Sequence, residues 1–293
     1  MTIRRAVAAP CFADDPMDLV ALAVEAEAAG FDGFFIWDHM VFANDGMGPS
    51  IVDPWAVLSV AAARTSSIVL GPMITPVPRR RPWVLARQTA TLDRIAGGRT
   101  VFGVGIGSPA HGDFGIFGDE TDARTRAAML DEGLDVLAGL WTGEPFQFHG
   151  EHYSISEVRF RPTPVRKIPV WVGGVLPAVA PMRRAARWHG AVPIRFADGG
   201  LARPSAADIA GVRDLVLDQR GSLDGYDFVV WAEVAADPVA VLAELPAYAD
   251  AGTTWWIETA KPEPDWYANL RRRIAMGPLG SVTSEGGSSG SAL

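Results

Sequence analysis

Short apolar runs alternate with longer amphipathic stretches along most of the chain. In residues 18–30, for example, Leu19, Leu22, Ala23 and Ala26 recur at helical spacing before a glycine. The predicted strands are 6–10, 33–37, 67–74, 100–106, 168–174, 190–196, 226–235 and 253–260. The predicted helices are 18–30, 53–65, 81–98, 124–141, 177–189, 204–221, 237–252 and 264–275.

This repeated alternation predicts the fold. Nearly continuous apolar strands are typical of parallel strands buried on both faces. Eight strand–helix units favour a closed (β/α)8 TIM barrel, with a doubly wound open sheet as the alternative. Residues 142–167 read as two short strands and a Pro-rich link, an insertion after the fourth helix. We therefore expect a barrel domain over 1–276 and a Gly/Ser-rich, disordered tail over 277–293.

Composition and charge narrow the class of protein. The net charge of −8 argues against a nucleic-acid partner, which would require a basic face. The single cysteine, Cys11, allows no disulfide within the chain and fits a reducing cytoplasm. No apolar run reaches the ~18 residues of a membrane span. We interpret the arginine run 79–81 as solvated charge at a helix end or an interface.

Candidate chemistry gathers where the predicted strands end, because TIM barrels carry their active sites there. His39 is the best acid–base candidate, since histidine gains or loses a proton near neutral pH; a structural histidine is the alternative. Asp38 points the other way along an extended strand, so the two need not bond. No metal-ligand spacing occurs, so no metal site is predicted. Substrate-pocket candidates at other strand ends are Pro10, Cys11, Arg195, Trp231 and Glu258.

Two glycine-rich segments suit a cofactor. Gly103, Gly105 and Gly107 alternate along one strand, so bare backbone lines one face; a flat ring on that face and close packing inside the barrel are the two explanations. A dinucleotide-binding loop is disfavoured because Ser108 replaces the third glycine and no helix follows at once. Gly173–Gly174 precedes a predicted helix, which suits a phosphate.

Several long segments resemble the bacterial-luciferase-like family of flavin- or deazaflavin-dependent oxidoreductases. They are "AGFDGFFIWDHM", "LGPMITPVPRRRPWVLARQTATLDRIAGGRTVFGVGIG", "LDEGLDVLAGLWTGEPFQFHGEHYSI", "PVWVGG", "AGTTWWIE" and "RRRIAMGP". The resemblance implies a (β/α)8 barrel with an insertion. It also implies that reduced FMN or the deazaflavin coenzyme F420 binds at the carboxyl end of the strands.

The resemblance also implies roles for individual residues. Asp38 and His39 match an acidic residue–His pair, in which the histidine assists chemistry near the flavin ring. Many members carry a bulge and a cis peptide behind the ring at the position of Pro72–Met73. The cofactor-binding residues so implied are Asp38, Pro72, Met73, Ile74, Gly105, Ile106, Gly107, Ser108, Gly173, Gly174 and Val175. Ser108 stands where the family's sugar-phosphate dehydrogenases carry a glutamate, which argues against their particular reaction.

The leading functional prediction is an FMN-dependent monooxygenase acting on a small organic substrate, with a flavin reductase supplying reduced flavin. The alternative is an F420-dependent hydride-transfer enzyme on the same barrel. A non-catalytic flavin-binding barrel is a second alternative, because fold does not fix function. A metal-dependent hydrolase lacks the clustered ligands it needs. The apolar helices at 53–65 and 81–98 offer a face for a homodimer.

Overall fold

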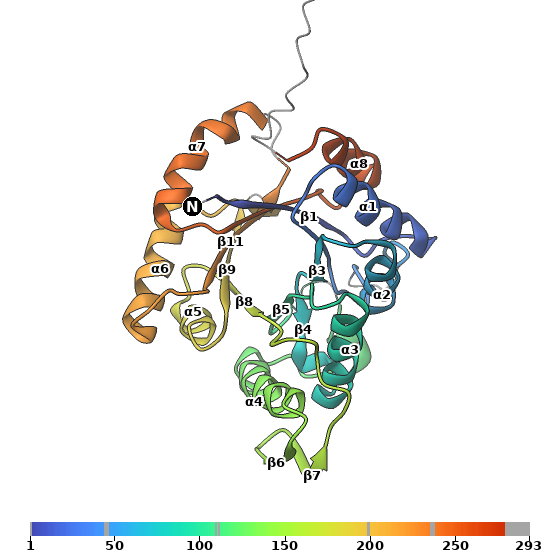
Figure 1. Ribbon diagram of the computed structural model, residues 1–293, viewed down its shortest axis with the longest axis vertical. Coiled ribbons are helices and arrows are strands. Elements are labelled where there is room, and N and C mark those ends of the chain that lie inside the picture. Colours follow the sequence, from blue (N-terminus) through green and yellow to red (C-terminus); the bar gives the residue numbers. More distant parts are fainter. Residues whose placement is uncertain are drawn as a thin grey trace, which may run out of the picture.

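The computed structural model describes residues 2–43, 47–108, 110, 112–197, 200–234 and 238–278, and it forms a ring of parallel strands surrounded by helices (Figure 1). The strands are β1 (Arg4–Ala9), β2 (Gly33–Ile36), β3 (Val69–Pro72), β4 (Thr75–Pro76), β5 (Phe102–Gly105), β6 (Pro145–His149), β7 (Ser154–Arg159), β8 (Val170–Val175), β9 (Gly190–Ala197), β10 (Gly200–Ala202), β11 (Asp227–Glu233) and β12 (Trp255–Thr259). The α-helices are α1 (Pro16–Ala28), α2 (Pro54–Arg64), α3 (Pro82–Ile95), α4 (Ala123–Trp141), α5 (Val179–Ala185), α6 (Ala206–Arg220), α7 (Pro238–Ala251) and α8 (Trp266–Ala275).

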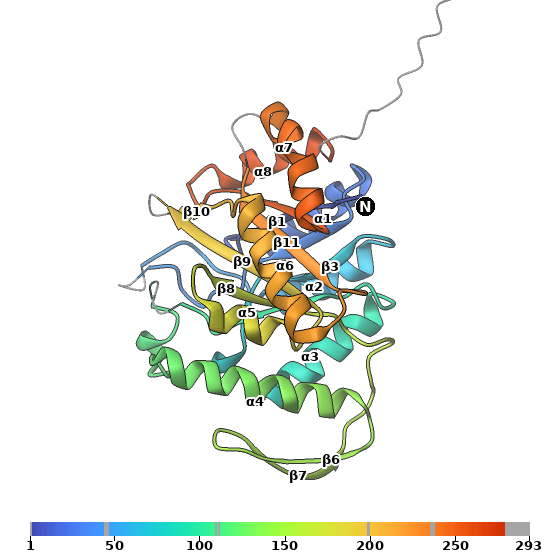
Figure 2. The ribbon, with the colours of Figure 1, turned by 90° about the vertical axis from the view of Figure 1, so that its left-hand side faces the viewer.

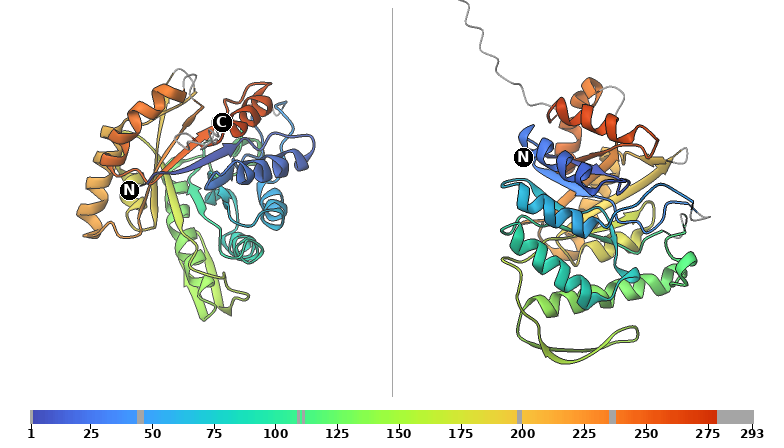
Figure 3. Two further views of the ribbon diagram at one scale, coloured as in Figure 1. Left: turned by 45° about the horizontal axis from the view of Figure 1, so that its top comes forward. Right: turned by 90° about the vertical axis from the view of Figure 1, so that its right-hand side faces the viewer.

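The main sheet closes on itself. Its order is β3-β2-β1-β12-β11-β9-β8-β5-β4, and its neighbouring strands are parallel. Backbone hydrogen bonds join the two sides of the remaining seam: the Leu70 N–H donates to Arg99 O at 2.9 Å, and the Val101 N–H donates to Leu70 O at 3.0 Å. The predicted TIM barrel is therefore confirmed over the open sheet, and the helices surround it in every view (Figure 3).

The third strand of the barrel is split. β3 ends at Pro72, a cis peptide bond joins Met73 to Ile74, and the chain resumes pairing as β4 beside β5. The cis bond therefore falls one residue after Pro72–Met73, where the family resemblance implied it. The segment between the two halves turns into the barrel, which brings Ile74 toward β5 and β8.

The helix starts follow local signals in the sequence. Asp53 accepts a hydrogen bond from the Ala56 N–H at 2.9 Å, and Pro54 opens α2, as the sequence predicts. Asp122 caps α4 in the same way. The helix predicted over 177–189 is shorter, because the chain leaves helical geometry after Ala185 and turns toward β9.

The insertion after α4 is the antiparallel hairpin of β6 and β7, which lies beside α4 and outside the barrel (Figure 2). Glu132 of α4 holds its turn by accepting the N–H groups of Glu151, His152 and Tyr153 at 2.7, 2.9 and 3.0 Å. This confirms the two predicted short strands. The short strand β10 is a second addition, and it pairs antiparallel with the end of β9.

An aromatic layer fills the barrel interior near the amino ends of the strands. Phe35, Trp171 and Trp255 are fully buried, with ring centroids 5.3–6.1 Å apart. Below them, the Trp171 indole N–H donates to Asp227 at 3.1 Å, and the Arg4 guanidinium lies over the Trp255 ring. Arg4 also pairs with Asp227 at 2.6 Å. The interior is therefore packed solid at this end, as is usual for this fold.

The predicted low-complexity tail, 277–293, lies outside the described residues from position 279 onward. None of the helices in the described part of the chain is long and apolar enough to cross a membrane.

Candidate active site

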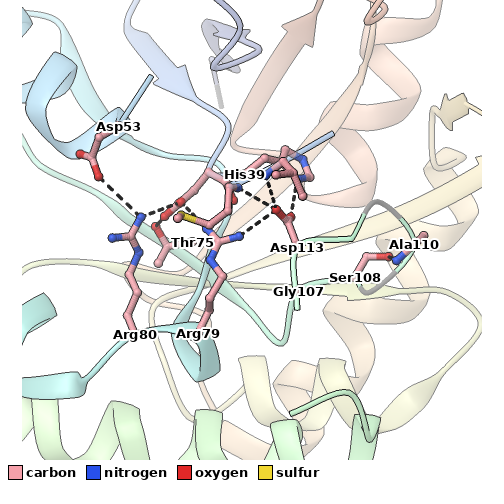
Figure 4. A network of polar contacts seen from close by, with 12 residues as sticks. His39, Asp53, Thr75, Arg79, Arg80, Gly107, Ser108, Ala110 and Asp113 are labelled. Atoms are coloured by element: carbon pink, nitrogen blue, oxygen red, sulfur yellow. Dashed lines mark hydrogen bonds and ion pairs between the residues drawn. The ribbon is translucent and has the colours of Figure 1, made fainter. Parts of the chain in front are cut away.

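His39 stands just after β2, at the carboxyl end of the barrel, and it pairs with a carboxylate from another loop. Its Nδ1 lies 2.6 Å from Oδ2 of Asp113, which follows β5 (Figure 4). Asp113 Oδ1 accepts the N–H groups of Met40 and Val41 at 2.7 and 3.1 Å and lies 3.2 Å from Arg79. With Nδ1 turned to Asp113, Nε2 is the nitrogen through which His39 can exchange a proton with a reactant.

Asp113 is held as a carboxylate. Burial acts to raise its pKa, but the hydrogen bond and charge of His39 outweigh that effect, together with the Met40 N–H and the Arg79 guanidinium. The net result is a pKa below the ordinary range of an aspartic acid. A buried, ionised Asp113 therefore fixes the orientation of the His39 ring.

Asp38 is buried next to His39, beneath the carboxyl end of the barrel. This carboxyl end, where His39 stands, is called the opening below. Its Oδ1 accepts from Arg79 at 2.5 Å and from Arg80 at 2.8 Å, while its Oδ2 accepts from the Thr75 hydroxyl at 2.8 Å. The side chain is buried. Asp38 and His39 bond to different partners, as expected for successive side chains of an extended segment. A contact between Asp38 and the cofactor stays a prediction.

The arginine run 79–81 is only partly solvated, contrary to the prediction. The Arg79 side chain is 3% exposed and that of Arg80 is 16% exposed. Arg79 joins the two acidic groups of the site, since one of its nitrogens bonds to Asp38 and another lies beside Asp113. This run is therefore part of the framework that positions His39.

Aromatic side chains line the wall beside His39. Its ring lies 5.0 Å from Phe42 and 6.0 Å from Trp37. The Trp37 indole N–H donates to Thr259 at 3.1 Å, and its ring meets Trp231 edge-on at 6.2 Å. The Trp231 indole N–H is buried and has no acceptor within the described part of the chain. The structure thus brings Trp231, a predicted substrate-pocket residue, to the same wall as His39.

Ile74 packs against β5 and β8 at Gly105 and Gly173. Its side chain occupies the space that a side chain on Gly105 or Gly173 would fill. The carbonyl of Pro72 does the same at Gly103. Close packing inside the barrel, one of the two explanations for the alternating glycines, therefore accounts for Gly103. At Gly105, the flat ring of a cofactor would contact the Ile74 side chain before it contacted bare backbone.

The segment 106–108 leaves β5 along the rim. Gly107 has φ +72°, and a Cβ there would lie 2.6 Å from the Phe114 ring, so glycine is required at this turn. Phe114 in turn lies under the guanidinium of Arg126, which is buried. Ser108 is exposed, and its hydroxyl accepts the Ala110 N–H at 3.2 Å. The position of 106–108 at the rim agrees with the predicted cofactor contact, which stays a prediction.

The second glycine segment ends β8. Gly174 packs closely against Pro181 and Met182 of α5, and Val175 stands at the rim with 45% of its surface exposed. The role of Gly173–Val175 in holding a phosphate stays a prediction.

Four other residues at strand ends were predicted to line a substrate pocket: Pro10, Cys11, Arg195 and Glu258. Pro10 and Cys11 are buried, and burial raises the pKa of the Cys11 thiol to about 12, so the thiol is inert. Arg195 points outward and binds Asp208 at the start of α6 with two hydrogen bonds of 2.5 and 2.7 Å. A substrate-pocket role for Pro10, Cys11 and Arg195 stays a prediction, although the pairing of Arg195 with Asp208 places its charge on the helix side of β9.

Glu258 is the fourth. It is buried on the outer face of β12, where it pairs with Arg273 of α8 at 2.5 Å. Along a strand, side chains alternate between the interior and the helix layer, and both Arg195 and Glu258 fall on the helix side. The position of a residue at the end of a predicted strand did not show whether its side chain faces the barrel interior or the helix layer.

Asp113 is the functional residue that the sequence did not reveal. It lies in a 17-residue loop between β5 and α4 with no periodic pattern. A carboxylate that could meet His39 is found only once the neighbouring strand ends are placed in space.

Comparisons with known proteins agree with this fold. Residues 4–212 match the family model described as luciferase-like monooxygenase, so the chain belongs to this family. It is 33% identical over 232 residues to a protein of Nakamurella multipartita named F420-dependent glucose-6-phosphate dehydrogenase, covering 76% of this chain and 64% of that protein. A protein of the same name from Microbacterium testaceum is 33% identical over 165 residues, and there the match spans about half of the relative (48%).

Solved structures confirm the fold. An F420-dependent secondary alcohol dehydrogenase in complex with an F420-acetone adduct superposes with a TM-score of 0.76 at 16% identity, covering 94% of this chain and 98% of that one. The monooxygenase RslO1 from Streptomyces bottropensis gives 0.72 at 19% identity, with the same coverage. The predicted membership of an oxidoreductase family is confirmed at the level of the family.

Proposed function

We propose that this protein is an F420-dependent oxidoreductase that transfers a hydride between the deazaflavin and a small organic substrate, with His39 as the proton donor or acceptor. The observation that carries the proposal is the His39–Asp113 pair at the carboxyl end of the barrel, with Asp113 buried and His39 20% exposed. Hydride transfer to or from an alcohol or carbonyl moves a proton as well, and a positioned imidazole provides for it. The names of the sequence relatives favour F420 over FMN, the leading prediction from the sequence.

The residues at the opening suit a flat ring with polar edges. Ile74 supplies an apolar side chain against β5 and β8, and the rim segments 106–108 and 173–175 would hold the rest of the cofactor. The Trp231 indole N–H is buried without an acceptor, so a bound molecule that brings a carbonyl or hydroxyl oxygen would satisfy it. When bound, the deazaflavin supplies the hydride chemistry; the barrel excludes water and orients the substrate beside His39.

The charges near the opening indicate an uncharged substrate. Recognition of a phosphate dianion calls for cations that are not already paired. The arginines that the structure describes beside His39 are already paired with carboxylates: Arg79 with Asp38 and Asp113, and Arg80 with Asp38. We therefore propose a neutral alcohol or carbonyl compound rather than the sugar phosphate in the relatives' names.

The test is a titration of the purified protein with F420 and with FMN, each oxidised and reduced, followed by fluorescence. We expect F420 to bind at least tenfold more tightly, and the loaded enzyme to turn over neutral secondary alcohols but not glucose 6-phosphate. Binding of neither cofactor would overturn the proposal. Preference for reduced FMN would replace it with the monooxygenase function in the family's description, for which a flavin reductase would be the partner.

We also propose that two copies of the chain associate through α2 and α3. Val60 and Val84 stay exposed on these helices, at 42% and 47%. Light scattering of the purified protein should give a dimer, and Val60→Asp with Val84→Asp should shift it to a monomer. A wild-type protein that is monomeric at all concentrations would exclude this association.

A further inference from the structure

A cavity of about 430 Å³ lies at the end of the barrel opposite His39. It opens beside Val170, the first residue of β8, and beside Trp188 and His189, which precede β9. Its remaining walls come from the end of α4 and from the segment that returns from the β6–β7 hairpin. The lining residues are Ala138, Trp141, Thr142, Thr163, Pro164, Val165, Arg166, Lys167, Ile168, Val170, Trp188 and His189. A volume of this size holds a small molecule.

The side chains that line the cavity offer hydrogen-bond donors and positive charge. No Asp or Glu is among the lining residues. The Trp188 indole N–H is buried and finds no acceptor within the described residues. A buried donor left unpaired is unfavourable, so a ligand oxygen would be favoured at this N–H. Lys167 makes no ion pair in the part of the chain that the structure describes.

His189 adds a second donor. Its Nδ1 accepts the Val170 N–H at 3.1 Å, which puts the imidazole proton on Nε2. Burial lowers the pKa of His189 to about 4, and the nearby charges of Lys167 and Arg220 act in the same direction. The side chain is therefore a neutral N–H donor in a positive environment at neutral pH.

The rest of the lining is apolar and aromatic. The Trp141 and Trp188 indoles stand with aliphatic side chains such as Val165 and Ile168. Trp141 has its own N–H satisfied by Thr89 at 3.0 Å, so it offers a ring face or edge rather than a polar group. A ligand for this cavity thus needs an apolar, ring-bearing body and an acceptor group with negative charge.

We propose that this cavity is a second binding site and that it takes an aromatic carboxylate, with the ring against the indoles and the carboxylate toward Lys167, the Trp188 N–H and His189. The site is separate from the opening that holds His39, because the aromatic layer of Phe35, Trp171 and Trp255 fills the barrel between its two ends. The proposal does not depend on the cofactor or on the substrate of the first site.

The test is calorimetric titration of the full chain with 2-naphthoate and with its neutral analogue 2-naphthamide. We expect 1:1 binding of the naphthoate and at least tenfold weaker binding of the amide. Trp188→Phe keeps a ring but removes the N–H, and it should weaken naphthoate binding about three- to tenfold. Lys167→Gln should weaken it by up to about fivefold.

The chain offers a matched control, since Lys167 and Lys261 are its only lysines. Lys261→Gln makes the same change in charge at an exposed position after β12, and it should leave naphthoate affinity unchanged. The proposal is overturned if neither probe binds at millimolar concentration, if both bind equally, or if the two lysine variants behave alike. Each variant's circular dichroism and melting temperature should match wild type, which keeps loss of binding distinct from loss of folding.

Discussion

His39 and Asp113 meet at 2.6 Å across 74 positions of sequence, each on the loop after a different strand. The carboxylate fixes which ring nitrogen faces the reactants, so Asp113 acts as a positioning residue for His39. We expect Asp113→Asn to lower kcat by more than tenfold, yet by less than the ~10²–10⁴-fold typical of losing the acid–base group itself. The cofactor dissociation constant should stay the same, and Asp113→Glu should recover part of the loss. A fall in cofactor affinity that matches the fall in kcat would contradict this role.

Removal of the imidazole itself gives a sharper result. His39→Ala should lower turnover by about 10²–10⁴-fold, because a positioned general acid or base contributes that much. Cofactor binding should be largely retained, since the side chain is 20% exposed beside the opening rather than part of its floor. Stopped-flow measurement of the hydride-transfer step, with cofactor affinity measured in parallel, separates the two effects. Unchanged turnover would show that His39 has no part in the chemistry.

Asp38 should matter for stability more than for binding. It is buried against Arg79 and Arg80, and removal of one partner of a buried ion pair typically costs about 3–5 kcal/mol. Asp38→Ala should therefore lower the free energy of unfolding in urea by this order. Asp14→Ala, at an exposed aspartate, provides the control. A loss below about 1 kcal/mol would mean that Arg79 finds another partner.

Glu27 should make stability depend on acid pH. Burial acts to raise its pKa, but the N–H groups of Ser67, Ile68 and Ser66 lower it to about 2. A carboxyl group whose pKa falls on folding stabilises the native state above its unfolded pKa near 4.5, and that stability is lost as the pH falls toward 2. Urea unfolding between pH 5 and pH 2.5 should show a steeper decline for wild type than for Glu27→Gln. If the stability of wild type and of Glu27→Gln fell equally with pH, Glu27 would not be the source of the acid dependence.

Arg195 offers a test of its placement on the helix side of β9. Because it holds Asp208 at the start of α6, Arg195→Gln should leave kcat and KM within about twofold. Its effect should appear in stability instead. Hydrogen bonding by Arg195 lowers the pKa of Asp208 to about 2, so the stabilisation is present above the ordinary aspartate pKa and disappears as the pH falls through 2. A large change in KM would restore Arg195 to the substrate pocket.

The barrel was predictable because each of its units is local. The apolar runs, the Asp53 cap and the glycine stops each act within a few residues, and eight repeats leave few ways to close a sheet. The same signals identified His39, since the end of a strand in this fold is a place for chemistry.

The partners of His39 were not predictable in this way. Asp113 reaches His39 from the loop after β5, and Arg79, which pairs with Asp113, follows β4; nothing in the spacing of the sequence links those two segments. The direction in which a side chain points was the second property that the sequence did not predict. Glu258 and Trp231 both lie near strand ends, but the first turns to the helix layer and the second to the interior, and a strand boundary misjudged by one residue exchanges those directions.

The aromatic layer closes the barrel interior at the amino ends of the strands, so the interior is accessible from the carboxyl end alone. With Phe35, Trp171 and Trp255 fully buried and the Arg4–Asp227 pair below them, no passage leads through the centre. A substrate of the proposed enzyme would then enter, and its product would leave, by the same carboxyl end, past Trp37 and Trp231. Product release, rather than hydride transfer, would then limit turnover, and a bulky product would slow the binding of the next substrate molecule.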